Sequence, residues 1–166
     1  MIDVAYVQRL ARYNRWQNES LYGVADTLTD AERKRARGAF FGSIHATLNH
    51  LLWADRFWMS RLAGTPNPGG SIPESVSTYS EWSDLKRERA AFDAVMLDWA
   101  DRLDAAALAG DLTWYSGAAK AERRKPRWLL VTHMFNHQTH HRGQVHCMLT
   151  QAGGKPGDTD LPLMPM

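Results

Sequence analysis

Four long segments with apolar residues at helical spacing, and almost no proline or glycine inside them, restrict the fold of this chain more than any other feature. They cover residues 3–27, 43–62, 80–103 and 126–151 of 166. Apolar side chains that recur every three to four residues form one face of an α-helix, and that face must be covered by another element. The sequence therefore predicts four long helices that pack against one another.

The ends of these segments carry the residues that commonly begin and end helices. Asp3 and Ser43 stand where an N-cap is expected, and Pro126 is suited to a first turn. Gly153 follows the last segment. We expect an all-α fold, a four-helix bundle that forms a single domain over residues 1–166. Residues 112–115 are β-prone and a Ser-Gly turn signal follows them, so a short β-hairpin before the last helix is compatible with the sequence.

Charge and composition exclude several classes of protein. The formal net charge is +2, and lysine and arginine are not gathered on one face, so we expect no nucleic-acid partner. No apolar stretch is long enough to span a bilayer, and the N-terminus lacks the pattern of a signal peptide. The single cysteine, Cys147, cannot form an internal disulfide and is expected as a small buried residue. We expect a cytoplasmic protein with no membrane partner.

The segment HMFNHQTHHRGQ in the last helix holds four of the seven histidines. At about 100° per residue, four side chains fall within about 60° of His137 on the helical wheel: His133, His140, His141 and Gln144. His137 and His141 lie one helical turn apart, a spacing at which two imidazoles can bind one ion. Gln138 stands where the HExxH motif of zinc proteases has its glutamate, so that chemistry is not expected.

A third ligand is available in the second helix, where His50 lies in NHLLWADRFW on a face of small and aromatic residues. Alone, His50 would more often be a core histidine with one hydrogen bond. The histidine cluster favours a metal site instead, because four histidines packed together without an ion would bury many ring nitrogens that need partners. His45 and Asp55 lie about 140° from His50 on the wheel, so neither is expected to be a ligand. Asp55 could cap a helix, pair with an arginine or orient a group that contacts the metal ligands.

Four segments together resemble the DinB/YfiT-like family: YNRWQNESL, GAFFGSIHATLNHLLWADRFW, HMFNHQTHHRGQVHCML and PGDTDLPLM. Their order and separation cover nearly the whole chain. The resemblance implies an up-down-down-up bundle with a long crossover between the second and third helices. It also implies a divalent metal, zinc or nickel in our expectation, held at the positions of His50, His137 and His141.

The resemblance implies a metal-dependent enzyme that acts on a small-molecule substrate. One form is a thiol-dependent S-transferase that uses a low-molecular-weight thiol, and another is a hydrolase. The alternative is a non-catalytic metal-binding or stress-response protein with the same three histidines. No catalytic residue can be assigned.

Further candidates for metal support or substrate contact are His133, His140, Gln144, Tyr13, Asn14 and Trp53. The last three could equally be core residues of the bundle. Residues 43–62 have a second apolar side: Ile44, Leu48, Leu51 and Leu52. Contact of this helix with two neighbouring helices would explain it, and so would a symmetric dimer interface. Members of the resembled family are often dimers. A homodimer is therefore expected.

Overall fold

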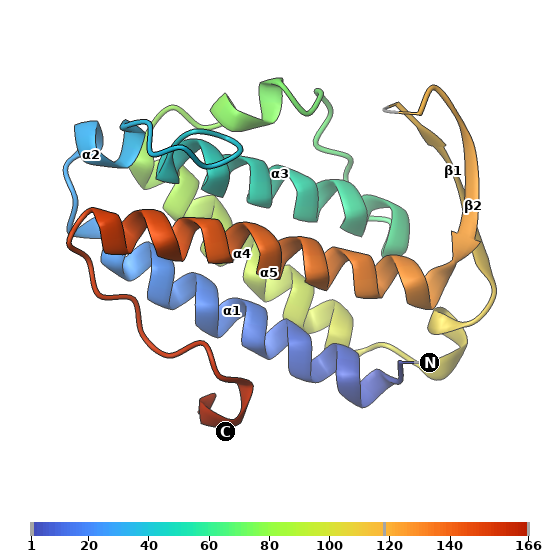
Figure 1. Cartoon of the computed structure of the whole chain (residues 1–166). Helices are drawn as coiled ribbons and strands as arrows, with labels where there is room; N and C mark the ends of the chain where they lie inside the picture. The colour runs from blue at the N-terminus through green and yellow to red at the C-terminus, as the bar shows by residue number, and fades with distance from the viewer. Residues whose placement is uncertain (1, 118, 166) are drawn as a thin grey trace.

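A computed structural model describes residues 2–117 and 119–165. Four long helices form a bundle: α1 (Val4–Asp26), α3 (Ile44–Leu62), α4 (Trp82–Asp101) and α5 (Arg127–Gln151) (Figure 1). Helices α1 and α5 run in one direction and α3 and α4 in the other, so the predicted up-down-down-up bundle is confirmed (Figure 1). The shorter helical elements are α2 (Asp30–Lys34) and the 3-10 turns η1 (Glu74–Ser77), η2 (Ala105–Leu108) and η3 (Leu161–Leu163).

The predicted helix starts follow from their capping side chains. The Asp3 carboxylate accepts a hydrogen bond from the Tyr6 N–H at 2.8 Å, and the Ser43 hydroxyl accepts one from the Ala46 N–H at 3.1 Å. Each of these bonds satisfies a backbone donor that the first helical turn leaves free. Helix α4 begins at Trp82, slightly later than predicted, and ends at Asp101.

The β-hairpin and α2 lie outside the four long helices. The predicted hairpin is confirmed: β1 (Asp111–Ser116) pairs antiparallel with β2 (Ala121–Pro126) and leads directly into α5. Helix α2 was not predicted, although the Thr29 hydroxyl caps it by accepting a hydrogen bond from the Glu32 N–H at 3.2 Å. The Thr-x-x-Glu pattern at this position is a recognised helix-start signal.

The apolar side chains of all four helices meet in one core. Four residues of α3 that had suggested a dimer interface are at most 3% exposed within this single chain: Ile44, Leu48, Leu51 and Leu52. That face is covered by the chain's own helices, so it gives no support to a dimer. The homodimer stays a prediction.

The connection between α3 and α4 crosses over α3 and is tied to it by side chains of α3 (Figure 1). The Trp53 indole N–H donates to the Gly69 carbonyl at 2.7 Å. The Asn49 amide accepts from the Tyr79 N–H at 2.8 Å and donates to the Tyr79 carbonyl at 3.1 Å. The crossover is thereby held as a wall beside the face of α3 that carries His50. Within the described ranges 2–117 and 119–165, no helix is long and apolar enough to cross a bilayer.

Candidate metal centre

Three histidines from two helices converge at one point. His50 comes from α3, and His137 and His141 come from α5; one ring nitrogen of each lies within 4.8 Å of the others. The His50 Nε2 and His137 Nε2 atoms are 3.4 Å apart. Two nitrogens that bind one zinc ion tetrahedrally at about 2.0–2.1 Å would stand roughly 3.3 Å apart. The donor set therefore fits a divalent ion of the kind that imidazole binds well, such as zinc or nickel.

Hydrogen bonds at the far side of two rings leave Nε2 free for an ion. The Ser75 hydroxyl donates to the Ile72 carbonyl at 2.6 Å, so its oxygen accepts the Nδ1–H of His50 at 2.8 Å. The amide oxygen of Gln144 likewise accepts the Nδ1–H of His141 at 3.0 Å. A proton held on Nδ1 puts the lone pair on Nε2, and such partners also fix the orientation of the ring. Ser75 lies in η1 of the crossover, which has no helical register relative to α3, so spacing could not place it.

The histidine rings are neutral at physiological pH. Burial, together with the neighbouring histidines, lowers the pKa of His50 to about 4 and that of His137 to about 3. Burial also lowers the pKa of His141. Imidazole binds metals only in its neutral form. The burial that makes a charged histidine costly here therefore keeps all three lone pairs available.

Phe41 covers the site from the segment before α3, and the sequence analysis did not identify it. Its ring centroid lies 3.9 Å from that of His50 and 5.3 Å from that of His141. The glycines on either side, Gly38 and Gly42, have φ values of +77° and +81°, which lets the chain turn sharply around this aromatic residue. A signal existed in GAFFGS, where two aromatic residues stand between such glycines.

A cavity of about 550 Å³ opens beside the histidines. His50 and His137 line it together with the side chains of α3, the crossover and β1. Trp53 is one of its walls, stacked on Phe57 at 4.8 Å, and His133 lies in the wall 5.9 Å from His137, measured between ring centroids. These two candidates are therefore placed where a substrate could contact them.

His140 and Gln144 also lie near the three histidines. The His140 ring lies 4.8 Å from that of His141, and the Gln144 amide nitrogen donates to His140 Nε2 at 3.3 Å. Gln144 thus bridges the two histidines. His140 is exposed, so it stands at the rim on the α5 side.

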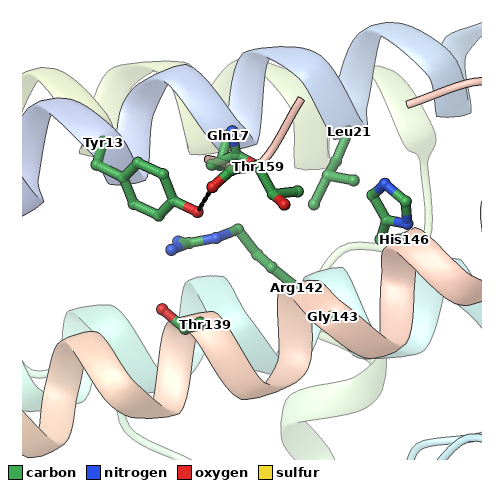
Figure 2. A pocket seen from close by; sticks show the side chains of 8 residues that line it. All are labelled: Tyr13, Gln17, Leu21, Thr139, Arg142, Gly143, His146 and Thr159. Carbon is green, nitrogen blue, oxygen red and sulfur yellow. Dashed lines mark hydrogen bonds between the residues drawn. The ribbon is translucent and has the colours of Figure 1, made fainter. Parts of the chain in front are cut away.

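Tyr13 and Asn14, by contrast, lie elsewhere, because α1 does not border the three histidines. Figure 2 shows Tyr13 in a separate cavity of about 440 Å³ between α1, α5 and the C-terminal segment, where its hydroxyl donates to the Thr159 carbonyl at 2.6 Å. Asn14 is buried and accepts from the Arg142 guanidinium. The rotation of α1 about its axis determines where Tyr13 and Asn14 lie. A sequence pattern does not determine how a helix is rotated toward a particular neighbour.

Asp55 belongs to a buried ionic network. No hydrogen bond among the described residues joins it to His50, His137 or His141. The Arg89 guanidinium donates to Asp55 at 2.6 Å and pairs with Asp93 at 2.8 Å, while Gln138 donates to Asp55 at 2.9 Å. Of the three roles that the sequence left open for Asp55, the structure shows the pairing with an arginine. His45, also excluded as a ligand, bonds to the Tyr79 carbonyl through Nε2 at 2.8 Å.

Cys147 corrects the sequence analysis in one respect: it is exposed, not buried. It lies on the part of α5 that turns away from the core and away from the histidine face. The helical wheel had placed it off the metal face but could not say whether a neighbour covers that side.

Comparisons with known proteins cover most or all of the chain. The family described as "DinB family" matches residues 1–166. The protein DinB of Bacillus subtilis (strain 168) is 25% identical over 167 residues, which span 96% of this chain and 92% of that protein. The crystal structure of a DinB-like protein from Bacillus cereus ATCC 10987 has a TM-score of 0.64 with 17% identity, over 86% of this chain and 90% of that one. The structural likeness supports the fold alone.

Proposed function

This chain belongs to the DinB family, and from that premise we propose that it is a metal-dependent enzyme acting on a small molecule. His50, His137 and His141 would hold one divalent ion. The observation that carries the proposal is the cavity of about 550 Å³ whose wall contains two of these histidines. A protein that only stores or senses a metal needs the three histidines but not an adjoining cavity of substrate size.

Three protein ligands leave a position for a further ligand, as in catalytic zinc sites, whereas structural zinc sites use four. A bound divalent ion would supply Lewis acidity and lower the pKa of a thiol or water at that position. Ser75 and Gln144 would keep His50 and His141 in the protonation state that binds an ion. Phe41 and Trp53 would exclude water from the reacting atoms.

We further propose that the ion is zinc or nickel and that the reaction is the transfer of a low-molecular-weight thiol to an electrophile, with hydrolysis as the second form. Two features support these choices: the all-imidazole donor set, and the lack of any carboxylate in the three-histidine cluster of the described residues. Among the described residues, no side chain that lines the cavity is acidic, so the proposal assigns no carboxylate as general base. The proposal also includes a cytoplasmic location and a homodimer. The apolar residues of α3 do not support the dimer, because they are buried within the single chain.

Metal analysis of untagged protein tests the proposal. We expect about one equivalent of zinc or nickel per chain in the wild type and in His146→Ala, and none in His137→Ala. His146 is a matched control because it lies on the same helix and lines the other cavity (Figure 2). Metal-loaded protein should then conjugate a thiol to an electrophile, and the His137→Ala variant should not.

Two results would count against the proposal in different ways. Equal metal content in the two histidine variants would show that the ion binds elsewhere. A stoichiometric ion at His137 without turnover of any thiol conjugate or ester would favour the non-catalytic metal-binding protein.

A further inference from the structure

Four aromatic side chains line the cavity beside the histidines: Trp53, Phe57, Trp58 and Trp114. Trp53 and Phe57 of α3 stack with an interplanar angle of 17°, and Trp58 meets Trp114 of β1 edge to face at 6.0 Å between centroids. The crossover adds Ile72 and Pro73. Rings arranged in this way offer flat faces to a flat apolar molecule, because aromatic pairs prefer offset stacking or edge-to-face contact.

One permanent charge stands among these rings. Arg61 is the only lysine, arginine, aspartate or glutamate among the described residues that line the cavity. Its guanidinium carbon lies 3.9 Å from the centroid of Phe57, 5.2 Å from Trp58 and 5.8 Å from Trp114. The three rings therefore hold the guanidinium in place on the cavity wall.

Arg61 has no acidic partner in residues 2–117 and 119–165. No carboxylate of this part of the chain lies within 4.0 Å of its guanidinium, and its one hydrogen bond goes to the Tyr115 carbonyl at 3.5 Å. Arg56, five residues earlier on α3, shows the contrast, because it pairs with Glu88 at 2.7 Å. A guanidinium presents a planar fork of donors that matches a carboxylate, so most of the donor capacity of Arg61 is left for a ligand.

The geometry points to a substrate with a flat aromatic body and a carboxylate, the body between the rings and the carboxylate on Arg61. The cavity volume of about 550 Å³ lies in the range of roughly 300–1,000 Å³ that small-molecule sites occupy. The inference rests on the proposed metal function only for the end of the substrate that faces His50 and His137. Recognition by Arg61 and the rings does not require the ion.

Calorimetric titration with 2-naphthoate and its neutral analogue 2-naphthamide tests this assignment. The two probes have the same ring system and differ in charge. We expect wild-type protein to bind the acid at least about tenfold more tightly than the amide, since hydrogen bonds to a charged group contribute about 1.5–3 kcal/mol. Arg61→Met keeps an apolar stem against Phe57 and should weaken the acid about tenfold while leaving the amide unchanged.

The controls separate charge recognition from packing and from the metal. Arg15→Met, an exposed arginine on α1, should bind both probes like the wild type. Arg61→Gln provides a second neutral variant should the methionine variant unfold. Equal affinity for acid and amide in the wild type, or equal weakening of both by Arg61→Met, would overturn the assignment.

The inference about Arg61 and the metal proposal fail in distinguishable ways. In chelator-treated wild-type protein the preference for the acid should persist although the metal is lost. If the preference persists in Arg61→Met while the metal content stays normal, the assignment of Arg61 is wrong and the metal site is unaffected.

Discussion

Two polar regions lie side by side within the bundle, and α5 contributes consecutive residues to both. His137 and His141 point to the candidate metal centre, whereas Gln138 and Arg142, each one residue later, point to the buried network around Asp55. Successive residues of a helix turn by about 100°, so one helix serves two regions with different chemistry.

The two regions differ in how their polar atoms are paired. In the network, all four carboxylate oxygens of Asp55 and Asp93 accept hydrogen bonds at 3.2 Å or less from Arg89, Gln138 and Asn18. At the histidines, the Nε2 atoms of His50 and His137 face each other at 3.4 Å, and no carboxylate of the described residues joins them. Removing one member of a buried charge network is costly, whereas the converging nitrogens of the three histidines could hold an ion between them.

The largest effect we expect comes from breaking the network. Arg89→Met leaves two buried carboxylates without their common cation, and removal of one partner from a buried pair costs about 3–5 kcal/mol of unfolding free energy. Urea denaturation measures this change. Arg87→Met, on an exposed position of the same helix, should leave the midpoint unchanged. A loss below about 1 kcal/mol for Arg89→Met would show that the network is not what stabilises this part of the core.

The next effect concerns the ion. A ligand at one hundred times its Kd raises the free energy of unfolding by about 2.7 kcal/mol, provided that it binds only the folded chain. Zinc added to chelator-treated wild type should produce a gain of this size, and His50→Ala should show none. The Arg89 variant should keep the gain in any fraction that folds, because Arg89 donates to the network and not to the histidines. An equal gain in His50→Ala would place the ion elsewhere.

We expect a smaller effect on metal affinity from the residues that accept hydrogen bonds from the histidine rings. Ser75→Ala removes the acceptor of the His50 Nδ1–H, and loss of such a partner typically lowers metal affinity about 10–100-fold. Competition with a chromophoric chelator measures the affinity. Ser77→Ala is the matched control, because it lies in the same 3-10 turn but is exposed. Affinity unchanged in Ser75→Ala would mean that packing alone orients His50.

The contrast between the two regions also explains what the sequence could predict. Periodicity located the four helices, and the helical wheel brought His137 and His141 onto one face and set Asp55 apart from His50. These inferences depend only on spacing within one helix. Spacing could not assign Tyr13 and Asn14, because their position depends on how α1 is rotated against α5.

Helical periodicity could not predict the positions of residues outside the long helices. Ser75 and Phe41 approach His50 from the crossover and from the turn before α3. Their positions depend on hydrogen bonds between segments, such as those of Asn49 with Tyr79. No local pattern encodes which segment a loop will touch. The capping pattern of α2, in contrast, was present in the sequence and could have revealed that helix.

His45 allows the smallest and most selective test, because it is a buried histidine that belongs to neither region. Its Nε2–H donates to the Tyr79 carbonyl, so this nitrogen has no lone pair for an ion. Burial lowers its pKa below the usual value of about 6.5. In chelator-treated protein the unfolded chain then takes up a proton near pH 6.5 and the folded chain only at lower pH, so stability present above pH 6.5 is lost as the pH falls. For one histidine the slope is at most about 1.4 kcal/mol per pH unit. Urea titrations between pH 7 and 5 should show a shallower loss in His45→Gln than in the wild type, with unchanged zinc binding at pH 7. Zinc binding lost in His45→Gln would break the distinction between histidines that hold the fold and histidines that hold the ion.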